Sequence, residues 1–387
     1  MVRTTSLILS RKNLALFLPL AGLSLILLVF TLVRFTKGLG AVTNLSDAFP
    51  WGLWVGFDVV CGVALAAGGF ILTGIVYLFN SERYKPVLRP AILTAFLGYL
   101  LVCLGLMYDL GKPWNIWHPL VMWNPHSVMF EVAWCVMLYT TVLALEFGSI
   151  VAEAMNWKKL VMAFHAVAVP LVLAGVLLST LHQSSLGSLF LIVPQKLHPL
   201  WYSSLLPLNF WLSAVAVGFA TVILESYTTS KLMKRGLELE LLIDLGRFLW
   251  LALVVYLTVR LQDMALRGAL SHVLDGGLES TAFLIEMSLF ASALILLTIR
   301  RTHASKLGLF FAALFALLGV VMNRLNVSII GLVSDSGVKY FPSWGEIVIT
   351  ATLTAMGFTI FFILVRFLPI FPPDEGHPNH VPTAAKH

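Results

Sequence analysis

Ten long apolar runs follow one another along the chain, separated by short polar segments. Each run has about the 17–25 residues that an α-helix needs to cross the hydrocarbon core of a bilayer. The pattern therefore predicts an all-α integral membrane protein with about ten transmembrane helices. These predicted helices cover approximately residues 14–36, 54–80, 88–109, 127–153, 160–182, 203–228, 243–264, 279–300, 305–330 and 344–368.

Composition agrees with this pattern, because a soluble globule of 387 residues would need far more polar surface than 11% charged and 59% hydrophobic residues provide. No long polar segment separates the runs, so we predict one polytopic membrane domain over residues 1–368 and a disordered tail over 369–387. The first run is followed only by a weak cleavage-like motif, Gly38–Ala41. We therefore expect it to remain as a helix and not to be a signal peptide.

The distribution of basic residues predicts the orientation of the chain. An even number of helices places both termini on one side, and that side carries 17 of the 25 Lys and Arg residues, against 8 on the other. Cytoplasmic loops carry the excess of Lys and Arg, so both termini are predicted to be cytoplasmic. This bias accounts for the net charge of +6. Membrane lipid is thus an expected partner and nucleic acid is not.

Cysteine and histidine positions argue against common redox cofactors. Cys61, Cys103 and Cys135 all fall inside predicted helices without paired spacing, so neither a metal site nor an iron–sulfur cluster of ordinary type is expected. A bis-histidine haem needs ligands from facing helices. Only His165 and His182 fall clearly inside apolar runs, and they share one predicted helix. The sequence therefore predicts no haem in this chain.

Four ionisable residues are predicted to lie at similar depth near the outer side of consecutive helices: Asp58, Asp109, Glu131 and His182. A carboxylate inside a bilayer costs roughly 2.5 kcal/mol or more, so such groups mark ion, proton or substrate pathways. Glu131 and His182 are the strongest candidates, because each lies in an apolar run with no neighbour in sequence to neutralise it.

Quinone chemistry fits these side chains. A quinone headgroup needs hydrogen-bonding groups near its carbonyls, an apolar slot for its tail, and proton donors for its reduction. The predicted headgroup ligands are Asp58, Asp109, Glu131, His182 and Gln183. A relay from the cytoplasm through Tyr99, Tyr139, Glu146 and Glu225 is a second hypothesis; alternatively Glu146 and Glu225 are interfacial acids.

The second half of the chain repeats the polar layer less neatly. Its members are Arg260, Asp263, Glu286, Asn323, Arg324 and Glu346. Pairs such as Arg324 with Glu286, or Arg260 with Asp263, are interpreted as ion pairs that fix helix packing. Glu346 is interpreted as an interfacial charge near a helix end. Outer loops rich in Trp, Pro and His are typical of an interfacial aromatic belt or of a docking platform for a partner subunit.

An ordered set of motifs on the predicted outer side resembles a known family. The motifs are Phe49–Asp58 (FPWGLWVGFD), Ala66–Gly69 (AAGG), His126–Glu131 (HSVMFE), Leu145–Phe147 (LEF), Leu181–Ser188 (LHQSSLGS), Lys196–Trp201 (KLHPLW) and Tyr340–Trp344 (YFPSW). Together they are similar to the HybB-type membrane subunits of quinone-reducing nickel–iron hydrogenases, within the NrfD/polysulfide-reductase membrane-subunit family. The resemblance covers nearly the whole chain.

The resemblance implies a haem-free subunit of the bacterial inner membrane that passes electrons between a periplasmic ferredoxin-like iron–sulfur subunit and menaquinone. The large and small nickel–iron hydrogenase subunits would complete the complex, in which this chain contributes the quinone site of a hydrogen:quinone oxidoreductase and not the hydrogen chemistry. By motif position, the resemblance places Glu131, Tyr99, Asp109 and His182 at the quinone or its proton path, and it suggests proton translocation.

Three other functions remain open. Related membrane subunits serve polysulfide, nitrite and alternative-complex-III electron transport, so family membership leaves the partner undetermined. A secondary transporter can also have ten helices, but such folds usually bind substrate near the bilayer centre. A passive anchor that holds a catalytic complex at the membrane is the third alternative.

Overall fold

The computed structural model describes residues 11–79, 81–193, 196–233 and 236–371. In that part of the chain, ten helical segments are long and apolar enough to cross a membrane, which confirms the all-α prediction. The longest helices are α2 (Arg11–Lys37), α5 (Lys85–Asp109), α7 (Val128–Ala154), α8 (Lys158–Leu189), α9 (Leu206–Met233), α10 (Leu239–Leu266), α11 (Gly277–Thr298), α13 (Lys306–Leu325) and α15 (Trp344–Phe367).

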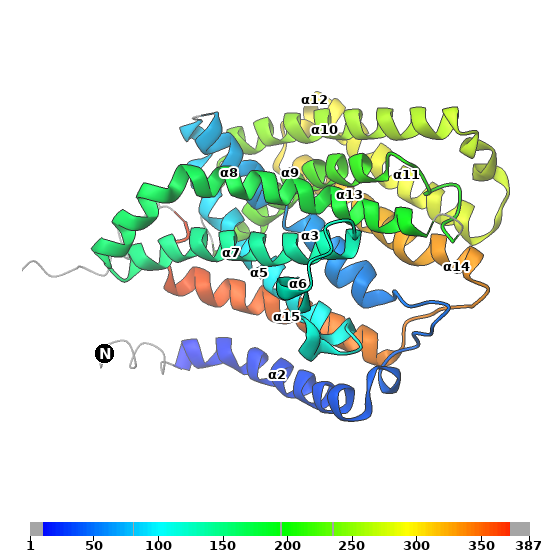
Figure 1. Ribbon diagram of the computed structural model, residues 1–387. Coiled ribbons are helices and arrows are strands. Elements are labelled where there is room, and N and C mark those ends of the chain that lie inside the picture. Colours follow the sequence, from blue (N-terminus) through cyan, green and yellow to red (C-terminus); the bar gives the residue numbers. More distant parts are fainter. Residues whose placement is uncertain (1–10, 80, 194–195, 234–235, 372–387) are drawn as a thin grey trace, which may run out of the picture.

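The long helices lie side by side, roughly parallel across the view in Figure 1. Their burial separates a centre from a periphery: 67% of the apolar window of α9 is buried inside the protein, against 6% for α2 and 11% for α8. The helix α2, dark blue in Figure 1, lies along one side and packs on α15. Lipid is therefore expected to cover most of α2 and one face of α8.

The second membrane span is not a regular helix. It consists of the π-helix η2 (Trp54–Cys61), α3 (Gly62–Leu65), α4 (Gly68–Thr73) and the π-helix η3 (Gly74–Leu78). A turn at 66–67 separates α3 from α4. The side-chain amide of Gln183 donates to the backbone oxygen of Val63 at 2.8 Å, just before this turn. Breaks of this kind are tolerated at membrane depth where neighbouring side chains satisfy the backbone.

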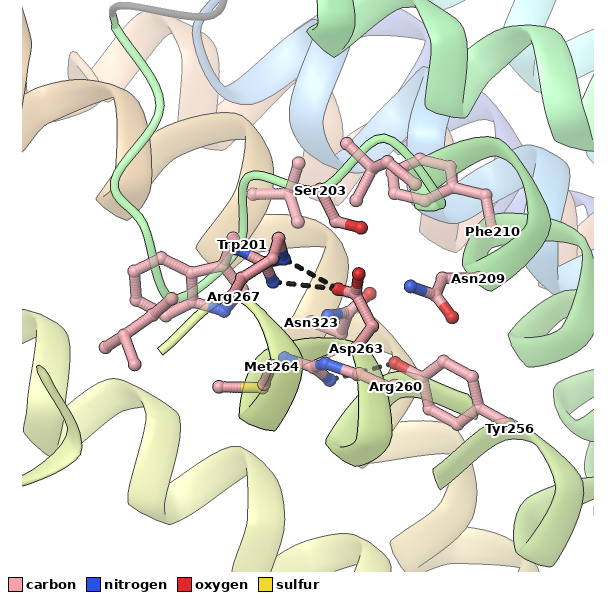
Figure 2. Close-up of a pocket in the computed structure, with 13 residues that line it drawn as sticks. Trp201, Ser203, Asn209, Phe210, Tyr256, Arg260, Asp263, Met264, Arg267 and Asn323 are labelled. Carbon is pink, nitrogen blue, oxygen red and sulfur yellow. Dashed lines mark hydrogen bonds and ion pairs between the residues drawn. The ribbon is translucent and has the colours of Figure 1, made fainter. Parts of the chain in front are cut away.

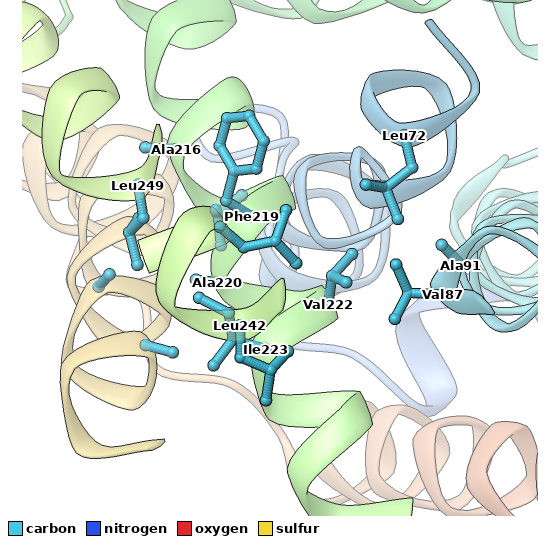
Figure 3. Packing of buried hydrophobic residues seen from close by; sticks show 14 of the residues in the cluster. Leu72, Val87, Ala91, Ala216, Phe219, Ala220, Val222, Ile223, Leu242 and Leu249 are labelled. Carbon is cyan, nitrogen blue, oxygen red and sulfur yellow. The ribbon is translucent and has the colours of Figure 1, made fainter. Parts of the chain in front are cut away.

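Small residues allow the helices of the interior to approach closely. Ala216 and Ala220 of α9 and Ala312, Ala313 and Ala316 of α13 have no exposed surface. Figure 3 shows α9 side chains, among them Phe219, packed between residues of the second span and of α10. A Cβ placed on Gly69 would come within 2.6 Å of the Cβ of Ala95. Such packing is the main source of helix association in lipid, where burial of apolar surface drives little.

The start of α15 shows how one predicted charge is used. Ser343 and Glu346 form a capping box, in which each side chain accepts a hydrogen bond from the other's backbone N–H. Glu346 also accepts hydrogen bonds from the Tyr340 hydroxyl and from the backbone N–H of Asn44, the latter at 3.1 Å. Burial and the adjacent carboxylate raise the pKa of the Tyr340 phenol. Glu346 lies at a helix end as interpreted, but it is fully buried and holds the cap of α15, so its interpretation as an interfacial charge is wrong.

The remaining helices are short. They are the α-helices α6 (His118–Val121), α12 (Arg300–His303) and α14 (Gly331–Ser336), the π-helix η8 (Asn326–Ile330), and the 3-10 helices η1 (Leu39–Ala41), η4 (Glu82–Tyr84), η5 (Pro113–Asn115), η6 (Phe190–Ile192) and η7 (Ala269–Leu274). Of the predicted tail, Pro369–Phe371 lie within the described residues, and Ile370 is buried against the bundle. Residues 372–387 lie outside the described residues. The predicted cytoplasmic location of both termini stays a prediction.

Candidate functional site

The structure divides the predicted outer layer into separate places. The Asp58 carboxylate accepts a hydrogen bond from the Thr350 hydroxyl of α15 at 2.8 Å. It also packs against Gly105 of α5, one turn before Asp109. One carboxylate oxygen of Asp109 is buried without a partner among the described residues, and the Arg34 guanidinium of α2 donates to the backbone oxygens on either side of it, those of Tyr108 and Leu110. This acidic pair therefore lies among η2, α2, α5 and α15.

His182 forms a second, fully buried place with Tyr99. The Tyr99 hydroxyl of α5 and Nδ1 of His182 of α8 are 2.8 Å apart, and neither side chain has exposed surface. The ring of Tyr139 from α7 packs edge-on against Tyr99, with centroids 4.7 Å apart. Nε2 of His182 and the hydroxyl of Tyr139 are buried and have no hydrogen-bond partner within the described part of the chain. Both atoms thus have unused hydrogen-bonding capacity.

Glu131 lies elsewhere. Its residue is exposed on the surface of α7, in the first turn of the helix, where a carboxylate interacts favourably with the helix dipole. The hydrogen bonds and ion pairs found among the described side chains do not join it to Asp58, Asp109 or His182. The shared depth inferred from sequence could not reveal this, because it says nothing of the direction in which a helical residue points.

The predicted relay residues reach toward the other end of the bundle. Tyr139 and Glu146, both on α7, lie beside Gly175 of α8. Glu225 of α9 accepts a hydrogen bond from the Thr94 hydroxyl of α5 at 2.9 Å, and its other oxygen is buried without a partner among the described residues. Since the Tyr139 hydroxyl also lacks a protein partner within those residues, any proton transfer between these groups would need intervening water.

The most extensive polar cluster of the described residues lies in the second half and is centred on Glu286. Its carboxylate has no exposed surface. Four donors from outside its own helix reach it: the guanidinium of Arg260, the side-chain amides of Asn323 (2.9 Å) and Asn326 (2.8 Å), and the indole N–H of Trp201 (3.1 Å). Such a set of donors satisfies the hydrogen-bonding capacity of a carboxylate that is buried in a low-dielectric interior.

The ion pairs anticipated in this region have different partners. Arg260 pairs with Glu286, whereas Asp263 pairs with Arg267, the residue just after the end of α10, at 2.9 Å. The interpretation that paired Arg260 with Asp263 and Arg324 with Glu286 is therefore wrong. Arg324 instead donates to the Phe210 oxygen and the Ser213 hydroxyl, each at 2.9 Å. Residues at spacing i, i+4 share a helix face more closely, and inter-helix partners are not visible in sequence.

A small cavity adjoins this cluster, with a volume of about 10 Å³. Figure 2 shows Ser203, Asn209 and Asp263 on its walls, with the Asp263–Arg267 pair beside them. The sequence pattern indicated Arg260 and Asp263 but gave no role here to Ser203, Asn209, Trp201 or Tyr256. Asn209, a polar residue in the first turn of α9 and within an apolar run, is the one sequence feature that could have indicated this cavity.

The tryptophans of the aromatic loops fall into a buried group and an exposed group. Trp54 and Trp201 are buried, with 0% and 3% of their surface exposed, so they belong to the packed interior. By contrast, Trp114, Trp123 and Trp344 expose 65%, 66% and 80%. Only the latter group fits an interfacial belt or a docking platform.

The histidines and cysteines considered as cofactor ligands lie as follows in the structure. His165 and His182 both lie on α8, the former exposed and the latter bonded to Tyr99. Cys61, Cys103 and Cys135 are free thiols. Within the described ranges, no group of three or more His, Cys, Asp or Glu side chains is placed to hold a metal ion.

Comparison with known proteins identifies the family. The pattern of the polysulphide reductase NrfD family matches residues 41–334, which include Asp58, the Tyr99–His182 pair and the Glu286 cluster. This chain is a member of that family. The resemblance expected from the ordered motifs is thereby confirmed.

Similar proteins span almost the whole chain. The "Probable Ni/Fe-hydrogenase 2 b-type cytochrome subunit" of Escherichia coli (strain K12) is 35% identical over 380 residues, which cover 95% of both chains. The "Menaquinone reductase, integral membrane subunit" of Nitratidesulfovibrio vulgaris is 28% identical over 368 residues, 87% of each chain. Another protein of Nitratidesulfovibrio vulgaris is 38% identical over 375 residues, which cover 93% of this chain and 95% of that protein.

Proposed function

We propose that this NrfD family protein is the quinone-reactive membrane subunit of a respiratory hydrogenase complex. In this function it passes electrons between a periplasmic ferredoxin-like iron–sulfur subunit and menaquinone in the bacterial inner membrane. Two electrons from the partner and two protons convert the quinone to the quinol. The similarity to a hydrogenase 2 subunit and to a menaquinone reductase subunit supports both the partner class and the substrate.

The buried Tyr99–His182 pair is the observation that carries this proposal. A protonated Nε2 on His182 would donate to a quinone carbonyl, while the Tyr99 hydroxyl on Nδ1 orients the imidazole, and the proton given up would be restored from the proposed relay through Glu225, Glu146 and Tyr139. The pair is out of contact with solvent, and Nε2 has no competing partner within the described structure. Asp58, Asp109 and Gln183 remain in the proposal as groups around the headgroup.

Glu131 has a more specific place in this proposal. Because it is exposed on α7, it can serve a quinone only where the headgroup meets the outer surface of that helix. Gln183 has a second role, since its amide already donates to Val63 and keeps α8 against the broken second span.

We also propose that the subunit acts without haem. His165 and His182 cannot supply opposite axial ligands to one haem, because they lie 17 residues apart on one helix, about 25 Å along its axis. The function is tested with the purified complex in detergent. Hydrogen-dependent reduction of a soluble menaquinone analogue is expected, and the dithionite-reduced membrane subunit should lack the absorption bands of a b-type haem. Isolation with a molybdenum enzyme in place of nickel–iron hydrogenase subunits would refute the hydrogenase assignment.

Proton delivery from the cytoplasm through Glu225, Glu146 and Tyr139 is the remaining component. Glu146→Gln keeps the size of the side chain and removes its exchangeable proton. Fewer of the two protons consumed per quinol should then come from the cytoplasmic side, and quinol formation should continue only as far as protons reach the headgroup from the opposite side. The ratio to measure, in oriented proteoliposomes, is the number of protons taken up from the lumen side for each quinol formed. Glu153→Gln, further along α7 in an ion pair with Arg89, is the matched control. An unchanged ratio in Glu146→Gln would remove Glu146 from the path.

A further inference from the structure

The cavity beside the Glu286 cluster lies among the start of α9, the end of α10 and the loop before α9. Ser203 comes from that loop, Asn209 from the first turn of α9, and Arg260 and Asp263 from α10. Its volume of about 10 Å³ suits one particle of about the size of a water molecule. Asn209 is 6% exposed and Ser203 is 2% exposed, so the walls are buried.

Several hydrogen-bond donors line this cavity, beside the Asp263 carboxylate and the unpartnered side-chain oxygen of Asn209. Figure 2 shows the amide nitrogen of Asn209 directed toward the space between Asp263 and Ser203. The Ser203 oxygen accepts from the backbone N–H of Leu205 at 2.9 Å, which leaves its O–H free to donate. Nη2 of Arg260 is buried and has no partner in the described structure. Buried donors left in this state call for an acceptor that the protein does not provide.

The charge balance of the cluster also favours a negatively charged acceptor. Arg260 and Arg267 of the cavity lining are balanced by Glu286 and Asp263. Arg324 does not line the cavity but donates to Asn323, which does, at 3.1 Å, so the cluster as a whole carries an excess of one positive charge. Arg324 is 1% exposed, and the hydrogen bonds it makes within the described residues go to neutral acceptors. An arginine stays charged in proteins, so deprotonation cannot relieve this excess. A buried charge without a counter-charge is strongly unfavourable.

We propose that the cavity binds one small monovalent anion, such as chloride, as the counter-ion of these buried arginines. The Arg260 guanidinium, the Asn209 amide and the Ser203 hydroxyl would hold it. Asp263 also lines the cavity and would repel an anion, but Arg267 neutralises it through two N–H groups that both reach Oδ2. Arg267 keeps 26% of its side chain exposed, so it lies at the rim through which an ion would pass.

Thermal unfolding of the full-length protein, with the partners that purify with it, tests this site. The protein is exchanged into gluconate and then titrated with chloride, bromide or sulfate at constant ionic strength. Chloride and bromide are expected to raise Tm by a saturable few degrees, because an anion that binds only the folded state stabilises it. Sulfate and gluconate are too large for the cavity and should leave Tm unchanged. Equal Tm in all four salts would overturn the proposal.

Two variants test whether the effect of chloride on Tm arises at this cavity. The side-chain oxygen of Asn209 has no hydrogen-bond partner within the described protein, so Asn209→Leu breaks no bond of that atom and should fold. The Tm of this variant should no longer respond to chloride. Arg247→Gln changes an exposed arginine on the same helix as Arg260 and should keep the full response. A full chloride response in Asn209→Leu would show that the anion binds elsewhere. The readout is stability without quinone, so its outcome is independent of the proposed electron transfer.

Discussion

Replacing His182 by Gln is expected to lower hydrogen-dependent quinone reduction by about 100-fold or more, the usual contribution of a positioned general acid or base. The amide of Gln can still accept a hydrogen bond from Tyr99, so the burial of that hydroxyl is not penalised. The imidazole is lost, and with it the group that can both give and receive a proton at Nε2. Steady-state turnover with a menaquinone analogue, normalised to the amount of assembled complex, measures the effect.

His165→Gln is the matched control for this variant. It makes the same chemical change on the same helix, at an exposed position, and should retain full turnover. Partner subunits should purify with both variants in equal amount. Normal turnover in His182→Gln would exclude the Tyr99–His182 pair as the reacting site. In the same assay, a Glu131→Gln loss as large as that of His182→Gln would place the headgroup at the outer face of α7.

Glu286→Leu should destabilise the folded protein by about 3–5 kcal/mol, the cost of leaving a buried charge without its partner. Arg260 loses its ion pair, and Trp201, Asn323 and Asn326 lose an acceptor. We expect a large fall in Tm and in the yield of monodisperse protein. Thermal unfolding followed by size-exclusion chromatography in detergent measures both.

A second pair of variants separates this charge effect from packing. Arg247→Gln removes an exposed ion pair with Asp244 on the same helix as Arg260 and should change stability by less than about 1 kcal/mol. Adding Arg260→Met to Glu286→Leu removes the stranded charge, so the double variant should regain part of the lost stability. A double variant less stable than Glu286→Leu would mean that the arginine stabilises the fold through its other contacts.

The sequence predicts which residues are candidates for the site better than it predicts which of them are in contact. Tyr99 and His182 were each recognised, yet their contact across 83 positions follows from how α5 and α8 pack. Depth alone groups Asp58 with His182, but Asp58 accepts a hydrogen bond from Thr350, a partner 292 positions away that no sequence pattern indicates. Glu131 illustrates the limit most clearly, because depth along a helix is readable from an apolar run and facing direction is not. The apolar runs show no polar face that would distinguish lipid from protein neighbours.

The linear chain is sufficient to establish ten membrane helices, the family and the presence of intramembrane charges, because bilayer thickness imposes a length and an apolar composition that can be counted. Which charges meet is a property of helix packing. The pairing of Arg260 with Glu286, the cavity at Asn209 and the break in the second span all depend on contacts between residues far apart in sequence. Inside a membrane those contacts arise from close packing and hydrogen bonding, which leave no periodic signal in the sequence.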